Sequence, residues 1–446
     1  MKQSFTVAIE KMVYGGKGMG RVEGKVVFVP FTAPGERIRA EVLHEKKDYA
    51  EAVLKEIEIG SPRRVPPFCP LYGDCGGCQY QHFAREDQLR LKEEAAREVL
   101  GRLSRKENFE FLPIVASPLD RGYRIRAQFK AGEKAGRKFL GFHAWRTHRV
   151  VEVTRCPLLD PLANRILSGL NEWLSGERDI PLKGADLQVS PEEGRGVVIL
   201  QTEGAWDHDK VQKMGRAIQG VKGIAWGQRD KFFWGDSALF YESPPIGGRR
   251  LRLRVSGESF VQVNPGQNEN LVRKVADWAE LTGEEKVLDL FCGSGNLTLP
   301  LALAARRVWG IDQDRQAIDS ARDNARRNGL PHCSFWAGPA EEGLRRVREE
   351  AAAVDLAVLD PPRVGAHAAL EPIASLRPRK ILYVSCEPPT LARDLARLGS
   401  LGYNVRRVQP LDMFPQTYHV ELIAELTAVS DQRSASRPGK MLTAEG

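Results

Sequence analysis

The stretch Lys286-Val-Leu-Asp-Leu-Phe-Cys-Gly-Ser-Gly-Asn296 decides the fold of the C-terminal half of the chain. Apolar, strand-forming residues lead directly into a glycine-rich turn, and a helical pattern follows the turn. Helix and strand alternate on both sides of this stretch from about residue 268 onward. This alternation predicts a doubly wound, mostly parallel α/β sheet. The predicted helices are 268–281, 296–305, 314–328 and 341–350, and the predicted strands are 286–291, 307–312, 333–338, 355–360, 380–386, 404–412 and 419–428.

The glycine-rich turn is suited to a small ligand that contains a ribose. Gly293 and Gly295 allow the backbone to approach a ligand closely, and Asp312 ends the next strand, where an acid can bind ribose hydroxyls. A dinucleotide site would carry a third glycine where this chain has Thr298, and Asp289 would repel a pyrophosphate. S-adenosylmethionine has a ribose, no phosphate and a positively charged amino acid end. We therefore expect S-adenosylmethionine here; the alternative is a tight β–α turn without a ligand.

Two further motifs end neighbouring predicted strands, namely Asp360-Pro361-Pro362-Arg363 and Ser385-Cys386-Glu387-Pro388. Methyltransferases that act on exocyclic amines of bases have an aromatic residue at the end of the first motif. Arg363 therefore disfavours amine methylation. A strand-end cysteine without context is most often a small buried hydrophobe, and this remains our interpretation of Cys292 and Cys333.

Cys386 is different because its strand ends at the same sheet edge as the glycine-rich turn. A thiolate that attacks C6 of uracil makes C5 nucleophilic enough to accept a methyl group. A base must then remove the C5 proton before the thiol can leave. Glu421, in His419-Val420-Glu421, is the candidate base. These residues predict methylation of uridine C5 through a covalent bond between Cys386 and C6.

The rest of the chain predicts a multidomain protein. Short strands separated by glycines predict a small OB-like β-barrel over 1–60. A mixed, mainly β central domain is expected over 61–83 and 119–255. An amphipathic helix at 84–103 belongs to a segment, 84–118, that we group with 256–430 in a Rossmann-like methyltransferase domain. Residues 431–446 are polar, and we expect them to be disordered.

The charge of the chain favours an anionic partner. The chain has 446 residues, with 66 Lys and Arg against 58 Asp and Glu, which gives a formal net charge of +8. Nucleic acid is the commonest partner of a basic chain, and RNA is the partner expected here. No long apolar run and no signal-peptide core are evident, so we expect a cytoplasmic protein without a membrane partner. No obligate protein partner is indicated.

Four cysteines form a candidate metal site in the predicted central domain. Cys69, Cys75 and Cys78 have the spacing C-x5-C-x2-C, and Cys156 lies farther along the chain. Four thiolates can hold either zinc or a [4Fe–4S] cluster, and their chemistry alone favours neither. The spacing differs from the C-x3-C-x2-C of radical S-adenosylmethionine enzymes.

These motifs together resemble the RNA (uracil-5-)-methyltransferase family, in the branch that acts on 23S ribosomal RNA. The N-terminal barrel looks like a TRAM domain, an RNA-binding module of that branch. The iron–sulfur signature C-P-x4-C-G-G-C-x-x-Q-H is met from Cys69 to His82, and its fourth ligand corresponds to Cys156. The resemblance therefore implies a [4Fe–4S] cluster and ribosomal RNA processing.

The resemblance also implies roles for single residues. Cys386 corresponds to the nucleophile and Glu421 to the base, and the family places the helix at 84–103 against the catalytic domain. The residues that correspond to the cofactor site are Gln262, Phe291, Asn296, Asp312 and Asp360.

Three positions depart from the family pattern. Glu387 stands where the family usually has Asn, and a carboxylate there should raise the pKa of the Cys386 thiol unless Arg363 or Arg393 offsets it. Asp312 replaces a common Glu and can do the same work. The loop after the third strand has Gly338-Pro339 in place of the residue that contacts adenine.

Two other functions are compatible with these residues. A cytosine-C5 RNA methyltransferase would use the same thiolate and needs a proton donor at the pyrimidine N3, for which Glu387 is a candidate. A non-catalytic RNA-binding iron–sulfur protein on a methyltransferase scaffold is the other alternative. A large separation between Cys386 and Glu421 would favour the non-catalytic protein.

Overall fold

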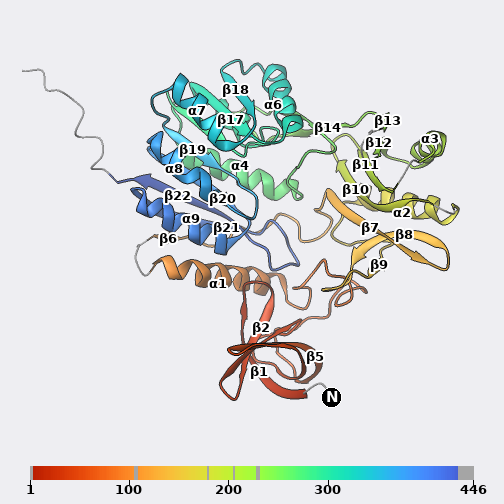
Figure 1. The fold of residues 1–446 in the computed structure, drawn as a ribbon. Coiled ribbons are helices and arrows are strands. Elements are labelled where there is room, and N and C mark those ends of the chain that lie inside the picture. The colour runs from red at the N-terminus through yellow and green to blue at the C-terminus, as the bar shows by residue number, and fades with distance from the viewer. Residues whose placement is uncertain (1–3, 105–108, 178–179, 204–205, 228–231, 430–446) are drawn as a thin grey trace, which may run out of the picture.

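A barrel, a central sheet and a larger α/β sheet make up the molecule (Figure 1). The computed structural model describes residues 4–104, 109–177, 180–203, 206–227 and 232–429. The tail for which we expect disorder, 431–446, lies outside these residues. Within them, no helix is long and apolar enough to cross a membrane.

The N-terminal strands form a closed barrel with the order β1-β2-β3-β5-β4. Alternating side chains such as Val7, Ile9, Val27 and Val29 fill its interior, which is why these short segments form strands that close on themselves. The predicted small barrel is thus confirmed. Its strands are β1 (Ser4–Val13), β2 (Lys17–Val22), β3 (Lys25–Pro30), β4 (Arg37–Glu45) and β5 (Tyr49–Ile59).

The central part is a mainly antiparallel sheet of order β13-β12-β11-β10-β7-β8-β9. Its apolar core includes Phe129, Ile166 and Val198, contributed by two strands and a helix. A separate hairpin leads on to the C-terminal sheet. The strands are β7 (Arg126–Lys134), β8 (Arg137–His143), β9 (Val150–Glu152), β10 (Leu182–Ser190), β11 (Arg195–Thr202), β12 (Val221–Trp226) and β13 (Phe232–Gly235); the helices are α2 (Pro161–Ser175) and α3 (His208–Ala217); the hairpin is β14 (Ala238–Glu242) and β15 (Arg252–Ser256).

The C-terminal sheet has the order β18-β17-β16-β19-β20-β22-β21-β6. Strands β16 to β20 are parallel, while β22 runs antiparallel to both of its neighbours. The mostly parallel sheet is therefore as predicted. Its strands are β6 (Glu110–Phe111), β16 (Lys286–Leu290), β17 (Arg307–Asp312), β18 (Cys333–Ala337), β19 (Leu356–Leu359), β20 (Lys380–Ser385), β21 (Tyr403–Leu411) and β22 (Glu421–Ala428).

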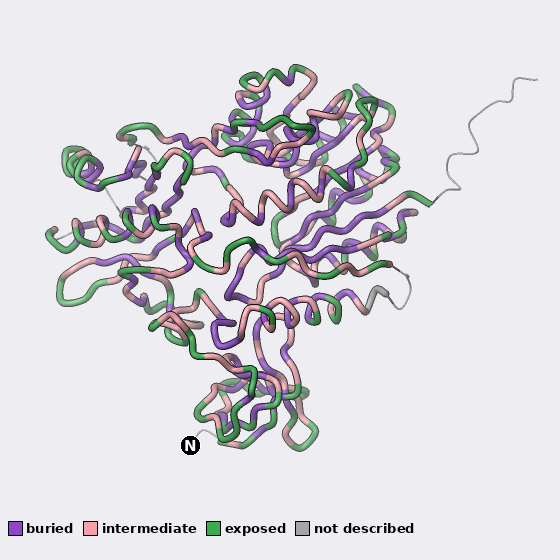
Figure 2. Tube along the Cα trace, turned by 180° about the vertical axis from the view of Figure 1, so that it is seen from behind, coloured by how far each residue is buried: buried purple, intermediate pink, exposed green. Residues whose placement is uncertain are grey.

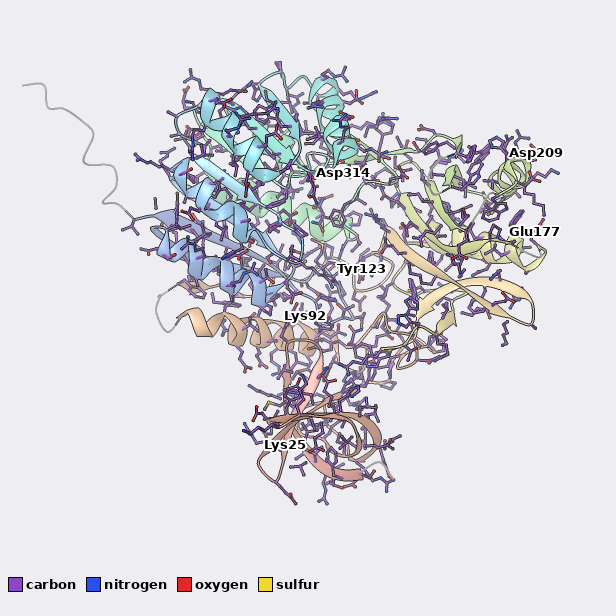
Figure 3. All side chains as sticks on the ribbon, in the orientation of Figure 1. Lys25, Lys92, Tyr123, Glu177, Asp209 and Asp314 are labelled. Carbon is purple, nitrogen blue, oxygen red and sulfur yellow. The ribbon has the colours of Figure 1, made fainter. Side chains whose placement is uncertain are left out.

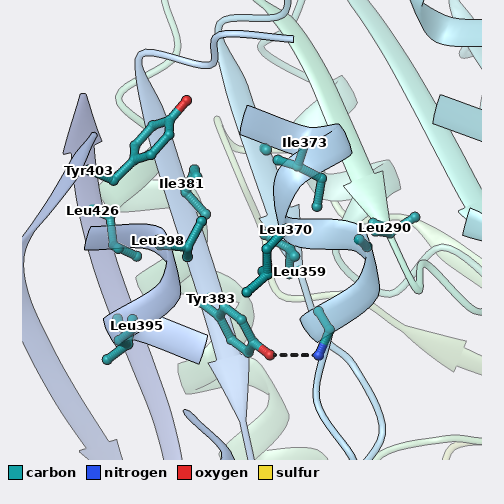
Figure 4. Packing of buried hydrophobic residues seen from close by; sticks show 14 of the residues in the cluster. Leu290, Leu359, Leu370, Ile373, Ile381, Tyr383, Leu395, Leu398, Tyr403 and Leu426 are labelled. Atoms are coloured by element: carbon teal, nitrogen blue, oxygen red, sulfur yellow. Dashed lines mark hydrogen bonds between the residues drawn. The ribbon is translucent and has the colours of Figure 1, made fainter. Parts of the chain in front are cut away.

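Helices cover both faces of this sheet, and Figure 2 shows its strands as largely buried. Successive residues of β20 belong to opposite cores: Ile381 and Tyr383 pack in one cluster, and Leu382 and Val384 pack in the other. In the first cluster the Tyr383 hydroxyl accepts a hydrogen bond from the Ala366 amide at 3.1 Å (Figure 4). The helices are α4 (Pro265–Ala279), α5 (Thr298–Ala302), α6 (Arg315–Arg327), α7 (Ala340–Glu350), α8 (His367–Ser375) and α9 (Pro388–Ser400).

Helix α1 (Arg85–Ser104) connects the barrel to the C-terminal sheet. It lies between the barrel and the C-terminal sheet (Figure 1), and Ala96 and Leu100 pack in the same core as Leu391 and Leu395 of α9. The expectation that this helix lies against the α/β sheet agrees with the packing.

Candidate functional site

Three of the predicted residues meet where strands of the α/β sheet end. Asp360 follows β19, Cys386 follows β20 and Glu421 begins β22. The antiparallel register pairs Ser385 with Leu422, so Cys386 and Glu421 come next to each other on neighbouring strands. The sheet topology thus brings a thiol and two carboxyl groups into one site. Cys386 and Glu421 are not widely separated, whereas a wide separation would favour the hypothesis of a non-catalytic protein.

The charges around the thiol define its chemistry. Burial is the largest effect, and with the Glu421 and Asp360 carboxylates it raises the pKa of Cys386 to about 12. Burial and Asp360 likewise raise the pKa of Glu421 well above its usual value, and burial raises the pKa of Asp360 to about 7. Arg363 acts in the opposite direction on both Cys386 and Glu421, because its positive charge favours their ionised forms.

The position after the nucleophile has a different role from the one predicted. We expected Glu387 to raise the pKa of the thiol, but the largest effects after burial come from Glu421, Arg363 and Asp360. Glu387 instead raises the pKa of Tyr14, which reaches this site from the barrel. Of the two offsetting cations that we considered, Arg363 faces the thiol.

Arg393, the other candidate, binds elsewhere. Its guanidinium donates hydrogen bonds to the Asp394 carboxylate and to the carbonyl of Val364.

The glycine-rich turn lies at the C-terminal end of β16. Gly293 and Gly295 have φ of 54° and 94°, and Phe291 adopts the left-handed region as well, with φ of 67°. The Gly293 amide donates to the Asp312 carboxylate at 2.9 Å, so Asp312 holds the turn in place. The amides of Phe291 and Cys292 donate to the Ile311 carbonyl, and the Gly295 amide donates to the Cys292 carbonyl, so internal hydrogen bonds fix the turn beside the carboxylate. An acid at the end of the second strand is where such folds bind ribose hydroxyls.

Asp289 is buried beneath this turn. Its Oδ2 accepts a hydrogen bond from the Thr298 hydroxyl at 2.5 Å, but its Oδ1 is buried without a partner in the described part of the chain. Burial raises the pKa of Asp289 to about 8. An unsatisfied carboxylate oxygen costs free energy unless a ligand supplies a donor.

The two remaining predicted cofactor residues are Asn296, at the end of the turn, and Gln262. Asn296 and Asn268 of α4 exchange two amide hydrogen bonds of 2.9 Å, which fix the Asn296 side chain. Gln262 is half-buried in the segment between β15 and α4. The next residue, Val263, accepts a hydrogen bond from the Ile125 amide at 2.9 Å, so this segment is tied to the central sheet.

The four predicted metal-ligating cysteines line one cavity of about 240 Å³, together with Tyr72, Gln81 and Arg124 among others. All four are free thiols. Burial, together with the neighbouring Cys156, Cys75 and Cys69, raises the pKa of Cys78 to about 12. In the described ranges, no three His, Cys, Asp or Glu side chains are close enough to ligate a single metal ion.

A loop that precedes Glu421 is held by residues that we did not predict. The Gln416 carbonyl accepts hydrogen bonds from the amides of Gln79 and Tyr80 at 3.1 and 3.0 Å. Its side-chain oxygen accepts a third from Gln88 of α1 at 2.9 Å. The cysteine segment and α1 therefore fix the position of the loop that leads to the base.

Lys92 of α1 strengthens this attachment (Figure 3 labels Lys92 and Tyr123). Its side chain is fully buried and forms an ion pair of 2.5 Å with Asp412. It also donates to the carbonyl of Phe414 at 2.9 Å, and the Tyr123 hydroxyl donates to the carbonyl of Pro415 at 3.0 Å. A lysine in an amphipathic pattern normally indicates a solvated face, which is why the burial of Lys92 could not be predicted from the sequence.

Comparison with known proteins identifies the family. Residues 85–428 match the family model described as tRNA (uracil-5-)-methyltransferase, and residues 3–55 match the TRAM domain. The chain belongs to the tRNA (uracil-5-)-methyltransferase family. It is an RNA methyltransferase of the uracil-5 class with an N-terminal TRAM domain, and the non-catalytic alternative is thereby set aside.

Individual relatives agree with this membership. The chain is 36% identical to an uncharacterized RNA methyltransferase of Thermosynechococcus vestitus, with 94% of this chain and 97% of the relative covered. It is 34% identical to an uncharacterized RNA methyltransferase of Halalkalibacterium halodurans, with 94% and 96% covered. Among solved structures, Pyrococcus abyssi tRNA (uracil-54, C5)-methyltransferase in complex with S-adenosyl-L-homocysteine is similar, with a TM-score of 0.71, 26% identity and 94% and 100% coverage.

Proposed function

We propose that this protein methylates C5 of a uridine in RNA through a covalent bond between Cys386 and C6. The adjacency of Cys386 and Glu421 at the ends of β20 and β22 carries the proposal. The thiol and the base must reach the same pyrimidine ring, and neighbouring strand ends provide that proximity.

Each residue has a defined part in this reaction. Arg363 stabilises the Cys386 thiolate as it attacks C6, and C5 then accepts the methyl group. Glu421 removes the C5 proton, and elimination of the thiolate restores the ring. Since burial and Asp360 raise the pKa of Glu421, its carboxylate is a stronger base than an exposed one.

S-adenosylmethionine would supply the methyl group from the site beside the glycine-rich turn. The residues fit this ligand because Asp289 Oδ1 is buried without a partner among the described residues, where a bound ammonium group would favour the ionised carboxylate, and Asp312 is positioned at the same turn. Phe291 and Asn296 flank the turn, and we propose that Gln262 and Asp360 position the cofactor and the uracil edge. The S-adenosyl-L-homocysteine complex of the Pyrococcus abyssi relative supports this proposal.

Trapping with 5-fluorouridine RNA tests the covalent step. Fluorine at C5 cannot be removed by a base, so wild-type protein with S-adenosylmethionine should remain bonded to the RNA. Cys386→Ala should form no adduct, whereas Cys333→Ala, at the start of the edge strand β18, should trap normally. Absence of an adduct in wild type, or an undiminished adduct in Cys386→Ala, contradicts the proposal.

The target RNA is a separate part of the proposal. We propose 23S ribosomal RNA, on the resemblance of the TRAM domain and cysteine signature to the 23S branch, and we place the reaction in the cytoplasm. The family description and the Pyrococcus abyssi relative name transfer RNA, which is therefore the competing target. Mapping of 5-methyluridine in both RNAs from a deletion strain decides between them.

Cytosine-C5 methylation is the second candidate reaction, because Glu387 could donate a proton to N3 if it were protonated. Nucleoside analysis of the product distinguishes 5-methyluridine from 5-methylcytidine.

We also propose that Cys69, Cys75, Cys78 and Cys156 hold a [4Fe–4S] cluster. Four free thiols around one cavity fit a cluster, in which each cysteine binds a different iron atom and the sulfurs stay farther apart than around one ion. The four residues would hold the cluster between the cysteine segment and the central sheet, within the proposed central unit of 61–83 and 119–255. Iron and acid-labile sulfide should be present in wild type, lost in Cys156→Ser and retained in Cys333→Ser.

A further inference from the structure

The tip of the barrel enters the methyltransferase site. Tyr14 lies in the turn between β1 and β2, and its ring meets Tyr418 edge-to-face, with centroids 5.7 Å apart. Gly16 in the same turn leaves no room for a side chain, because a Cβ there would be 2.9 Å from the Tyr418 ring. The barrel and the loop before Glu421 are therefore in close contact at this point.

The Tyr14 hydroxyl lies among the reacting groups, where the Glu387 carboxylate interacts with it without forming a hydrogen bond of normal geometry. Its oxygen is buried and makes no hydrogen bond of normal geometry to the described residues. The Glu387 carboxylate and the Cys386 thiolate are both close enough to raise the pKa of the phenol. A buried hydroxyl without a partner costs free energy, so its retention beside the nucleophile indicates a partner that arrives with the substrate.

A groove of about 780 Å³ leads to this hydroxyl from the barrel surface. Phe28 and Tyr49 line its barrel side, and Pro389 and Ala392 of α9 line the opposite side. Aromatic rings along such a groove stack on the bases of a single RNA strand. Because α9 begins two residues after Cys386, a strand in this groove passes the nucleophile.

Building on the proposed function, we propose that Tyr14 is a substrate-binding residue that the barrel contributes to the methyltransferase site, where its hydroxyl donates a hydrogen bond to the target pyrimidine. The acceptor is a carbonyl or ring nitrogen of the base, because the neighbouring Glu387 carboxylate would repel a phosphate. Tyr14 as donor and Glu387 as acceptor together match a pyrimidine edge, which presents an acceptor beside an N–H donor.

Tyr14→Phe tests this contact because it removes only the hydroxyl. With 23S ribosomal RNA or transfer RNA transcripts that contain 5-fluorouridine, the second-order rate constant for adduct formation should fall about tenfold. Thermal unfolding of the free protein should be unchanged or shifted upward, since the hydroxyl has no hydrogen bond of normal geometry to the described residues and lies beside a carboxylate. Tyr403→Phe is the comparator: its hydroxyl donates to the carbonyl of Pro378 at 3.1 Å, so this variant should be less stable but trap RNA normally.

Two results overturn the proposal: an unchanged rate constant for Tyr14→Phe, or a loss of thermal stability in proportion to the loss of rate. Affinity for the same transcripts, measured with Cys386→Ala and with Cys386→Ala/Tyr14→Phe, separates this inference from the proposed function. Failure of wild type to trap RNA refutes the covalent function alone. If wild type traps RNA, an unchanged trapping rate for Tyr14→Phe refutes the role of Tyr14 alone. If wild type does not trap RNA, equal RNA affinity of the two Cys386→Ala variants refutes that role.

Discussion

Arg363 and Asp289 are the residues whose charge matters most to the site. Arg363 favours the ionised forms of Cys386 and Glu421, which burial disfavours. Asp289 is held by Thr298 on one side only and has a pKa of about 8. Each residue makes a prediction about pH dependence.

The rate of adduct formation should rise with pH between about 6 and 9, because the pKa of the Cys386 thiol lies above this range. Arg363→Gln should lower the rate about tenfold throughout, because it raises the pKa of the thiol further. Arg363→Lys keeps the positive charge, so its rate of adduct formation should lie between the rates of wild type and Arg363→Gln. The rate of 5-fluorouridine trapping, measured for each protein across this pH range, tests these predictions. A wild-type trapping rate that does not depend on pH would contradict the raised pKa of the thiol.

Asp289 should make the free energy of unfolding depend on pH in the absence of cofactor. Its folded-state pKa of about 8 lies above the usual 3.8, so the folded state holds an extra proton between these values. The stabilisation is complete below the unfolded pKa and is lost as pH rises through about 8. Between about pH 5 and pH 9, the free energy of unfolding of wild type should fall by a few kcal/mol more than that of Asp289→Asn. Urea unfolding at each pH measures this difference. Parallel curves for the two proteins would refute the raised pKa.

Helix α1 acts at the scale of elements, because it fixes the loop that leads to Glu421. Lys92 connects the helix to Asp412, and Gln88 connects it to Gln416. Met413 and Val420 of this loop pack in the two cores of the α/β sheet, and the polar contacts from α1 add fixed partners for the segment between them.

Removal of one partner from the buried pair should be costly. Lys92→Met leaves Asp412 buried without its cation, and we expect the free energy of unfolding to fall by about 3–5 kcal/mol. The control is Lys11→Met, which breaks the ion pair between Lys11 and Glu98, a residue of α1. In this pair the Lys11 side chain is 44% exposed and the Glu98 side chain is 56% exposed. That change should cost about 0–1 kcal/mol. Similar losses in the two variants would show that burial does not govern the Lys92 pair.

At the scale of the whole molecule, the barrel completes the methyltransferase site. Gly16 permits the contact with Tyr418, and the β1–β2 turn brings Tyr14 beside Glu387. The relative position of barrel and sheet is thus a condition for binding RNA next to the nucleophile.

Two neighbouring glycines test this condition. Gly15 and Gly16 both have positive φ, 100° and 75°, so an alanine strains the backbone by about 1 kcal/mol at either position. Only Gly16→Ala also meets Tyr418, and it should reduce RNA trapping about tenfold more than Gly15→Ala does. S-adenosyl-L-homocysteine affinity, measured by calorimetry, should be unaffected in both. Equal trapping by the two variants would contradict the prediction.

Strand ends of the parallel sheet could be predicted from the sequence because buried strands are continuous apolar runs, and polar residues at their ends are conspicuous. Asp360 and Cys386 were found in this way, whereas Glu421 lay inside the predicted strand 419–428 and was chosen because the reaction needs a base. The predicted helix at 296–305 was too long: Gly295 and the residues after it belong to the turn, and α5 covers only Thr298–Ala302.

The contacts that the sequence did not reveal join residues far apart in the chain. Lys92 and Asp412 are 320 positions apart, and neither belongs to a motif. From the sequence alone, Tyr14 cannot be distinguished from other residues of the barrel. Its contact with Tyr418 is evident only in the folded structure. Periodicity describes one element at a time, so it gives no information about which elements meet.

Strand β22 lies between β20 and β21, although it follows both of them in the chain. Until β22 has been synthesised, neither β20 nor β21 has its partner along the edge that β22 occupies. A ribosome that stops before Glu421 would release a chain with two unpaired strand edges, which favour aggregation, and without the base. Quality control by chaperones and proteases would therefore meet either a complete methyltransferase or an aggregation-prone fragment, with no partially active product between them.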